Sequence, residues 1–563
     1  MPSKRILKAR PNVALAAIVG LCVGLPVLSA VVTGSIHIPH NDDWAYFRTV
    51  FHLAENGDLE FVGWTVMTFV GQLLWAAPLA ELFGRSLPPI VLANAVISAA
   101  GLLMTYSLAR RFLGSSYALL VVLSVGIFPG FVVLVPTFMT DPAAYTAQMG
   151  CLLLGLRALD RGGRGRLVLL IASLIAGLYA FSVREFAIAA PLAVLISLFF
   201  QEKQERASSS VSVVGFGGLI VGSAALYLWR HSFSGSSPQF LGFQLGGDLL
   251  IFLAQAFFTL SMGLIPVVLF LTSRDERAAG RVINFGWLIA ALLLIITLFS
   301  SGVSACCADG PASVFLGNLL TERGVLGNQV LPGKQPTLFP LPIWWILSAA
   351  AVVSGAMFAG RLHSSFSQWK WVRPQSPVLM VAAFGVLHSG AVIFWGILGG
   401  PIFDRYLIPP LLVVSVLLLR ARTKPARVWN PGTVASTALL GAVSFVLVSS
   451  GHAFDVARWK AAEIAVSSGV PAQDVDGGFE WVGFHYEGAA QSGAPNRPLD
   501  PGPGYLDLFP RAGNCAIVTS SPAASPQLDL IDSVPYRSLL GLRTHRVWVY
   551  RFARACTQEG LSS

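Results

Sequence analysis

Charged residues are scarce in this chain. Only 12% of its 563 residues are Asp, Glu, Lys or Arg, whereas soluble domains average about 25%. Hydrophobic residues make up 54% of the chain, and the mean hydropathy is +0.67. These values exclude an ordinary soluble protein. They predict an all-α polytopic membrane protein that is embedded in the lipid bilayer.

The net charge of +10 does not indicate nucleic-acid binding. Lys and Arg residues occur in short clusters between apolar runs, which is typical of the cytoplasmic loops of membrane proteins. One such cluster, Lys4 to Arg10, precedes the first apolar run, Asn12 to Thr33. The N-terminus is therefore predicted to be cytoplasmic, and the residues after Thr33 are predicted to lie outside.

Cysteine is also scarce, with six residues in the chain. Two of them, Cys22 and Cys151, lie in apolar runs and are interpreted as core thiols. An outer compartment permits a disulfide between Cys515 and Cys556, but sequence alone does not determine the pairing. No CxxC or His-rich pattern occurs. No cofactor is therefore firmly predicted, although a divalent metal stays open.

The apolar runs predict about thirteen transmembrane spans, since one span needs about 20 apolar residues. The run from Leu167 to Phe200 is interrupted by Arg184-Glu185, which predicts two short helices that meet at the outer face. The spans are expected to begin near Asn12, Pro88, Ser116, Pro142, Leu167, Phe186, Val211, Leu249, Val282, Leu341, Val378, Leu407 and Thr433.

Two regions are predicted to lie outside the bilayer core. The first outer loop, residues 34–87, contains an amphipathic stretch, Trp44 to Asn56, which favours a helix in the membrane interface. Trp64 to Phe83 is interpreted as a second interfacial or re-entrant piece. The alternative for this piece, a full span, would reverse the side of every later loop.

The composition changes after Ser450, where Gly, Pro, Asp and Arg become more frequent and long apolar runs stop. We therefore predict a transmembrane domain over residues 1–450 and a small outer α/β domain over 451–563. Cys515 to Thr519 and Arg546 to Phe552 are rich in β-branched or aromatic residues and predict strands. Gly477 to Gly504 is expected to be a loop.

Two adjacent carboxylates, Asp42 and Asp43, follow the first span. An N-cap for the following helix accounts for one of them, but not for a pair. Charges beside a bilayer are costly, which favours a function such as a general base or a cation site. Asp141, in Thr140-Asp141-Pro142, is a further candidate on the same face, although an N-cap explains it equally well.

Four residues are predicted to bind a phosphate at the outer face. Arg184 interrupts an apolar run, and its planar guanidinium suits phosphate oxygens; the alternative is a local ion pair with Glu185. Arg405 and Tyr406 open a late span, where interfacial anchoring is the alternative role. Arg230 is a weaker candidate of the same kind. A carboxylate base and cations at this depth suit the attack of an acceptor hydroxyl on a lipid-phosphate sugar.

These residues and the overall order of segments resemble GT-C membrane glycosyltransferases, in particular the family 39 branch with protein O-mannosyltransferases and the lipid A aminoarabinose transferase. Asp42-Asp43 is similar to the acidic motif of the first outer loop in that family, and Arg405-Tyr406-Leu407 is similar to a common motif before a late span. Val183-Arg184-Glu185 keeps only the cation of the usual Thr-Lys-Gly turn.

The resemblance implies Asp42 as catalytic base, a polyprenyl-phosphate-linked monosaccharide as donor, and inversion at the anomeric carbon. It also implies a bacterial cytoplasmic (inner) membrane enzyme with its C-terminal domain on the periplasmic or extracellular side. The acceptor hydroxyl could belong to a protein, to lipid A or to an envelope glycan. The main competing prediction is a transporter or flippase, but such proteins carry charges at mid-bilayer and often contain repeats.

Overall fold

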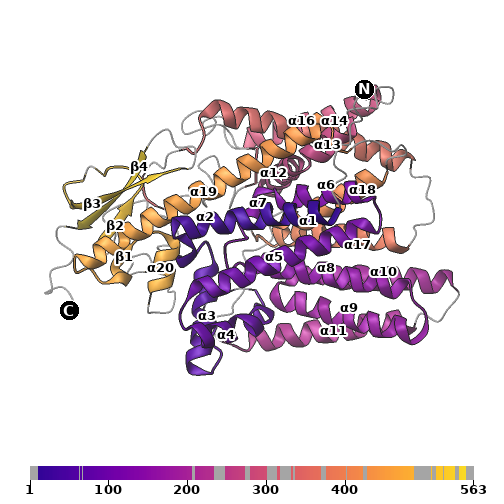
Figure 1. Ribbon diagram of the computed structural model, residues 1–563, viewed down its shortest axis with the longest axis horizontal. Coiled ribbons are helices and arrows are strands. Elements are labelled where there is room, and N and C mark those ends of the chain that lie inside the picture. The colour runs from indigo at the N-terminus through magenta and orange to yellow at the C-terminus, as the bar shows by residue number, and fades with distance from the viewer. Residues whose placement is uncertain are drawn as a thin grey trace, which may run out of the picture.

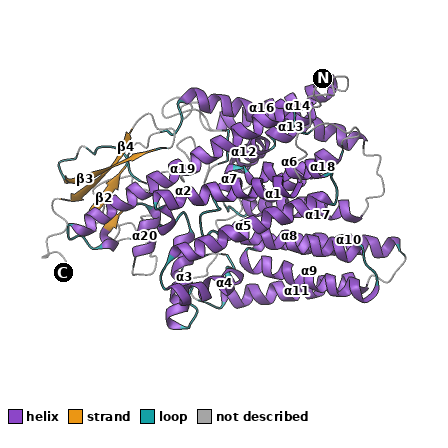
Figure 2. Ribbon diagram, in the orientation of Figure 1, coloured by secondary structure: helices purple, strands orange, loops and turns teal. Residues whose placement is uncertain are grey.

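The computed structural model describes residues 11–62, 64–65, 67–205, 210–233, 247–272, 279–300, 314–316, 331–333, 337–368, 376–400, 402–421, 428–486, 509, 515–523, 525–538 and 544–552. Most of these residues are helical, and the helices run roughly along one direction in a bundle (Figures 1 and 2). A small sheet lies at one end of the long axis.

The helices of the N-terminal half follow the predicted order closely. A first helical segment with a π-helical stretch is followed by two shorter helices in residues 34–87 and then by long apolar helices. The elements are α1 Pro11–Val19, η1 Gly20–Gly24, α2 Leu25–Thr33, η2 Ser35–His37, α3 Asp43–Asn56, α4 Val70–Phe83, α5 Leu87–Arg110, α6 Ser115–Gly126, α7 Pro129–Val132, α8 Thr140–Leu159, α9 Gly163–Val183, η3 Glu185–Ile188, α10 Ala189–Gln204 and α11 Ser210–His231.

The second half continues the bundle and ends in the C-terminal segment with the sheet. Its elements are α12 Gly247–Gly263, α13 Ile265–Thr272, α14 Ala279–Ser300, α16 Leu341–Gln368, α17 Ser376–Ile397, η4 Asp404–Leu407, α18 Ile408–Arg420, α19 Pro431–Ser467, η5 Ala472–Asp474, β1 Val475–Asp476, α20 Phe479–His485, β2 Ala516–Thr519, β3 Leu528–Arg537 and β4 Thr544–Phe552.

A helix begins within a few residues of every predicted span start. By length and composition, however, the described part of the chain holds eight helices able to cross a membrane, or up to nine if the bent pair α12 and α13 forms one span. The predicted count of about thirteen is therefore not confirmed. Helices α6 and α18, of 12 and 13 residues, are shorter than a full span.

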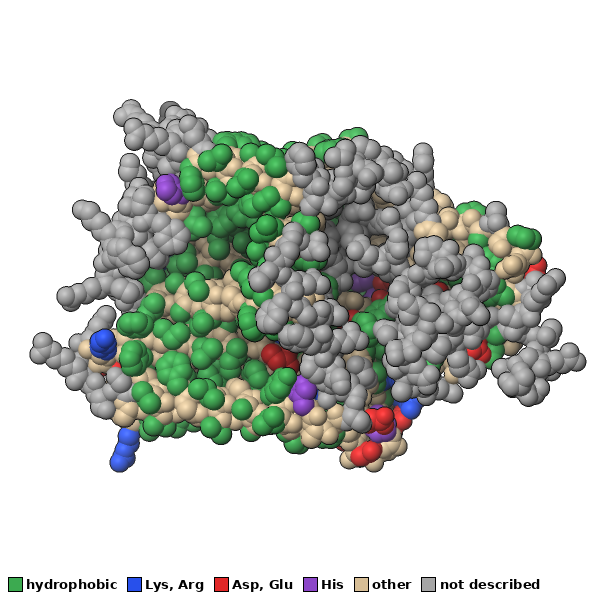
Figure 3. All heavy atoms as spheres, turned by 180° about the vertical axis from the view of Figure 1, so that it is seen from behind, with side chains coloured by type: hydrophobic (Ala, Val, Ile, Leu, Met, Phe, Trp, Pro, Cys, Tyr) green, Lys and Arg blue, Asp and Glu red, His purple; other side chains and the backbone are tan. Residues whose placement is uncertain are grey.

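The bundle presents apolar side chains outward, as lipid contact requires. Val32 is 76% exposed, Val214 73% and Val386 73%, and hydrophobic side chains cover much of the bundle surface in Figure 3. In water this pattern would be unfavourable, because each buried Val or Leu contributes about 1.5–3 kcal/mol. The multi-pass membrane class predicted from hydropathy is thus confirmed by the arrangement of the helices.

The two stretches singled out in residues 34–87 are both helical. The amphipathic stretch becomes α3, which buries Trp44, Phe47 and Phe51. Helix α4 has 14 residues and is about 21 Å long at 1.5 Å per residue, too short to cross about 30 Å of hydrocarbon. It therefore agrees with the interfacial or re-entrant interpretation of this segment.

The C-terminal segment contains a four-stranded sheet in the order β1-β2-β4-β3. β2 and β4 confirm the two predicted strands, and β1 pairs with β2 in parallel. β3 was not predicted because it contains Pro535 and several charged residues; its place at the sheet edge explains why proline is tolerated. The prediction of a loop from Gly477 onward is wrong for Phe479–His485, which forms α20.

No linker separates the membrane helices from the sheet. Helix α19 has 37 residues, so the predicted boundary at residue 450 lies inside one continuous helix. Its last turns pack against β3 and β4, and Figure 1 shows it running from the bundle to the sheet. Cys515 is disulfide-bonded, whereas Cys556 lies outside the described residues.

Candidate active site

Three segments that are far apart in sequence converge at one end of the bundle. Asp141 lies in the first turn of α8, Arg184 lies at the break between α9 and η3, and Arg405 and Tyr406 belong to η4. Arg184 has an extended backbone conformation that ends α9 and turns the chain back into α10. The sequence therefore places a charged residue in each of these three segments.

Arg184 is at the centre of this group. One terminal nitrogen donates to Asp141 Oδ2 at 2.7 Å and to Thr140 Oγ1 at 2.9 Å, and the other donates to the Tyr406 hydroxyl at 2.9 Å. The guanidinium is 7% exposed. Such charge-assisted bonds in a buried setting fix the position of the cation. The hydrogen bonds of Arg184 therefore go to Asp141, Thr140 and Tyr406. The Glu185 carboxylate instead accepts a hydrogen bond from the Thr68 backbone N–H.

Arg405 lies between the carboxylates of Asp42 and Asp141. Its Nε is 3.5 Å from Asp141 Oδ2, and its Nη2 is 3.6 Å from Asp42 Oδ2. Both separations are long for hydrogen bonds. Within the described part of the chain, Nε and Nη1 of Arg405 are buried and have no hydrogen-bond partner. A buried guanidinium with unpaired donors is costly, and an anion at this position would satisfy them.

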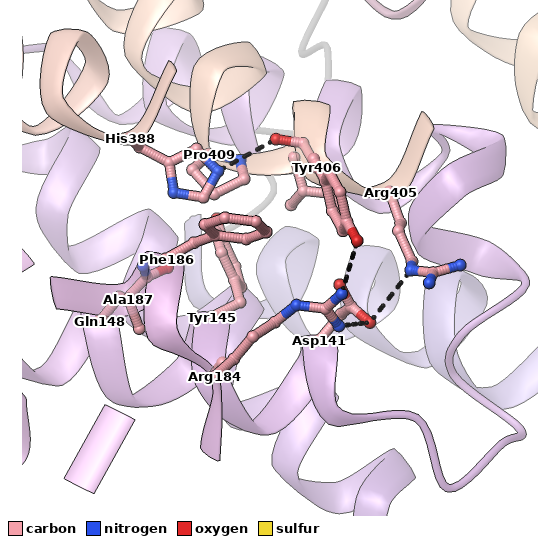
Figure 4. Close-up of a pocket in the computed structure, with 12 residues that line it drawn as sticks. Asp141, Tyr145, Gln148, Arg184, Phe186, Ala187, His388, Arg405, Tyr406 and Pro409 are labelled. Atoms are coloured by element: carbon pink, nitrogen blue, oxygen red, sulfur yellow. Dashed lines mark hydrogen bonds and ion pairs between the residues drawn. The ribbon is translucent and has the colours of Figure 1, made fainter. Parts of the chain in front are cut away.

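A small cavity of about 30 Å³ opens beside these residues. Figure 4 shows Asp141 joined to both Arg184 and Arg405, with Tyr406 above them and His388 and Phe186 along the wall. The wall combines charged and aromatic side chains at the ends of helices. It is lined by Asp141, Ala144, Tyr145, Gln148, Arg184, Phe186, Ala187, His388, Arg405, Tyr406, Ile408 and Pro409.

The adjacent carboxylates Asp42 and Asp43 have different surroundings. Asp42 is partly exposed, with 19% of its side chain accessible, and accepts a hydrogen bond from Trp64 Nε1 at 2.9 Å. Asp43 is fully buried, and its two oxygens accept the backbone N–H groups of His40 at 2.6 Å and Phe138 at 3.0 Å. Burial raises the pKa of Asp43 to about 7, against the opposing effect of His40.

These contacts suggest a division of roles within the acidic pair. Asp43 ties the turn that carries Asp42 to the segment that leads into Asp141, since Phe138 lies three residues before Asp141. Asp42 is the carboxylate of the pair that faces Arg405. The N-cap alternative is not observed for Asp42, since its side chain makes no capping hydrogen bond to α3.

Arg230 lies at the end of α11, and the structure places it against the first outer loop. It donates to the Thr65 carbonyl, and its guanidinium lies 3.6 Å from the centre of the Phe61 ring. Among the described residues, Arg230 is not part of the cavity wall that contains Asp141 and Arg405. Arg230 therefore stabilises the first outer loop through its contacts with Thr65 and Phe61.

Sequence reasoning missed three residues of this region. Trp64 Nε1 donates to Asp42, and His388, from the middle of apolar helix α17, donates from Nε2 to the Tyr406 carbonyl at 3.1 Å. The hydroxyl of fully buried Tyr46 has no hydrogen-bond partner among the described atoms. Burial and the Asp42 carboxylate raise its pKa, while Arg184 and Arg405 oppose this, so Tyr46 lies within electrostatic reach of the site. A lone His in an apolar run was a signal for function.

A second, larger cavity of about 700 Å³ is open to solvent and lies between α3 and α20. Its wall mixes aromatic, basic and acidic side chains from the first outer loop and the C-terminal segment. The lining includes His37, Arg48, His52, Glu55, Arg85, Trp459, Phe484, His485 and Tyr486. Within the described ranges, no cluster of three or more His, Cys, Asp or Glu side chains is arranged to hold a metal ion.

Comparison with known families gave a partial match. Residues 71–229, just over a quarter of the chain, match the family described as dolichyl-phosphate-mannose-protein mannosyltransferase. This region includes Asp141 and Arg184 but neither Asp42 nor Arg405. No match to the chain was found among curated protein sequences.

Two solved structures are similar in overall shape. ArnT from Cupriavidus metallidurans bound to undecaprenyl phosphate is 14% identical, with a TM-score of 0.41, over 96% of this chain and 98% of that chain. The apo state of the same protein gives 14% identity and a TM-score of 0.40 over 95% and 97%. The expected resemblance to GT-C membrane glycosyltransferases is confirmed by the family match over residues 71–229.

Proposed function

We propose that this protein is a glycosyltransferase that moves a single sugar from a polyprenyl phosphate to an acceptor hydroxyl, with inversion, at the outer face of a bacterial cytoplasmic membrane. The observation that carries the proposal is the convergence of Arg184, Arg405, Asp141 and Asp42, in which Arg405 keeps buried donors without a partner. The family match over residues 71–229 supports a glycosyltransferase.

The phosphate of the donor fits the open side of Arg405. Its oxygens would accept from Arg405 Nη1 and Nε, and the neighbouring Arg184 adds a second positive charge beside the same cavity. Asp141 contacts both guanidinium groups and so holds them apart at fixed positions. As the phosphate leaves with the electron pair of the broken bond, these cations stabilise its growing negative charge.

Asp42 is placed to act as the general base. It takes the proton of the acceptor hydroxyl while the acceptor oxygen forms a bond to the anomeric carbon and the bond to the phosphate breaks. Attack opposite to the leaving phosphate inverts that carbon. Its hydrogen bond from Trp64 orients one oxygen, and the other faces Arg405. Tyr46 and Tyr406 add hydroxyl groups near the same charges.

The distribution of charge along the bundle supports an outer position for the site. Helix α8 has 20 residues, so its ends are about 30 Å apart. The candidate site lies at the first turn of α8, and the Arg111–Asp160 ion pair lies beyond its last turn. Arg166 and Glu205 pair at 3.3 Å across the next loops of that end. A basic end opposite the site agrees with the positive-inside rule.

We expect the acceptor to enter from the side of the second cavity, whose wall combines Trp459 and Phe484 with Arg48 and His52. Aromatic rings beside polar groups suit a polar acceptor with apolar faces, such as a glycan. Gene deletion and complementation, read out by mass spectrometry, would identify the sugar and the acceptor.

The test is gene deletion in the host followed by complementation with wild type, Asp42→Asn or Asp141→Asn at equal membrane levels. Envelope glycans, lipid A and glycoproteins are then compared by mass spectrometry. We expect one sugar mass to disappear on deletion, to return with wild type and to stay absent with Asp42→Asn. Full restoration by Asp42→Asn would exclude the catalytic base and favour a transporter or flippase instead.

A further inference from the structure

A buried ionic cluster lies behind the turn that carries Asp42 and outside the cavity. Arg458 Nε is 2.8 Å from Asp455 Oδ1, and Arg458 Nη2 is 2.7 Å from Glu480 Oε2. Arg458 is fully buried and also donates to the Gly477 carbonyl. His40 Nδ1 is 3.0 Å from Asp455 Oδ2. These residues come from the first outer loop, α19 and α20, so the cluster joins both ends of the chain.

The turn itself needs external support. Asn41 has a φ of 55°, a left-handed conformation that residues other than glycine adopt at a cost. Its backbone N–H donates to Glu480 Oε1 at 2.9 Å. Glu480 thus uses one oxygen for the His40–Asn41 peptide and the other for Arg458. The bond fixes the orientation of the peptide group that precedes Asn41, one residue before the candidate base.

His40 is held in the same way on the other side of the turn. Its Nε2 lies 3.0 Å from the Ser35 carbonyl, and its Nδ1 faces the Asp455 carboxylate. Both ring nitrogens therefore face oxygen acceptors, which holds the ring between α19 and the first residue of η2. His40 and Asn41 are consecutive, so two neighbouring residues before Asp42 are each fixed by the C-terminal part of the chain.

We propose that Glu480, supported by Arg458, is a positioning residue for Asp42, and that the C-terminal segment is in this way a working part of the catalytic site. The inference rests on the proposed transferase function and deepens it. A carboxylate that serves as base must lie within hydrogen-bond reach of the acceptor hydroxyl, and a displacement of about 1 Å costs on the order of 100-fold in rate.

The experiment compares Glu480→Ala, Glu480→Gln and Glu463→Gln in the full-length protein in host membranes. Glutamine keeps an oxygen for the Asn41 N–H but loses the charge beside Arg458. Glu463 is an exposed carboxylate on the same helix as Arg458, so its variant is the matched control. Three quantities are measured: the sugar mass formed per folded protein, the thermal stability, and the binding of undecaprenyl phosphate as a probe.

We expect Glu480→Ala to lower product formation per folded protein by about 100-fold while the probe still binds as to wild type. Glu480→Gln should recover most of the rate, and Glu463→Gln should match wild type. Wild-type rates per folded protein for Glu480→Ala, with only its stability reduced, would overturn the inference. If Glu480→Ala does not fold, a Glu480→Gln variant that folds yet stays as inactive as Asp42→Asn would overturn the role of the Asn41 hydrogen bond.

Failure of this inference is distinct from failure of the proposed function. If no sugar mass depends on the gene, or if Asp42→Asn is fully active, the transferase function itself fails. If Asp42→Asn is inactive and Glu480→Ala behaves like the Glu463→Gln control, the function stands and the positioning role of Glu480 is wrong.

Discussion

Two isosteric substitutions at adjacent positions are expected to affect different properties. Asp42→Asn should mainly lower the reaction rate, and Asp43→Asn should mainly lower the stability. In Asp42→Asn the Trp64 N–H still finds an amide oxygen, and the lost ion pair with Arg405 is long, at 3.6 Å. We therefore expect a change in stability of no more than about 1 kcal/mol. The loss of a general base should lower the rate by about 10² to 10⁴-fold, or about 3–5 kcal/mol in activation free energy.

Asp43→Asn should mainly lower the stability of the folded protein. The two oxygens of Asp43 accept two backbone N–H groups, and an amide offers only one oxygen, so its NH₂ group must face one of these donors. An unsatisfied buried donor costs about 1–3 kcal/mol. We expect lower thermal stability and a reduced amount of folded protein, with a rate per folded molecule that falls less than in Asp42→Asn.

The assay is size-exclusion of heated, detergent-solubilised membranes for stability, with the sugar mass formed per folded protein for activity. Wild type and the Glu463→Gln control are measured in parallel. A rate for Asp42→Asn within about threefold of wild type would refute the reasoning. So would an Asp43→Asn protein that is as stable as wild type but inactive, because Asp43 would then be the base.

Four further predictions follow from the same geometry. Arg184→Lys cannot reproduce three hydrogen bonds from one planar fork, so the rate should fall by about 10² to 10³-fold; unchanged turnover in the mass assay would contradict this. Tyr46→Phe removes a hydroxyl without a described partner, so thermal stability should be kept while the rate falls about 10-fold; equal rates would show that the hydroxyl does not reach the substrate. Trp459→Ala should raise the acceptor KM about 10-fold with little change in kcat if the second cavity admits the acceptor; a normal KM would place entry elsewhere. Burial raises the pKa of Asp43 to about 7, so the folded state keeps a proton that the unfolded state loses; stability should therefore fall as the pH rises from about 4 to about 7, and thermal scans of Asp43→Asn should show a weaker slope.

The sequence alone determined the helical membrane class, because bilayer spans need long apolar runs and internal backbone hydrogen bonds. It also located the breaks between helices, and the charged residues at two such breaks, Arg184 and Arg405, lie close together around Asp141. The amphipathic stretch became α3, and β2 and β4 formed where β-branched and aromatic residues are concentrated. Strand β3 escaped prediction because of Pro535 and its charged residues, and α20, with 7 residues, is too short to show a helical period.

The tertiary structure decided which of these residues meet. Local patterns did not distinguish Asp42 from Asp43, because adjacent residues point to different sides of the chain and only packing buries one of them. They also did not separate Arg230, which packs on Phe61, from Arg184, which binds Asp141. Glu480 reaches Asn41 from 439 residues away, and contacts at such separation depend on the complete fold. The sequence thus determined where charge interrupts the apolar helices, and the folded bundle decided which of those charges act together.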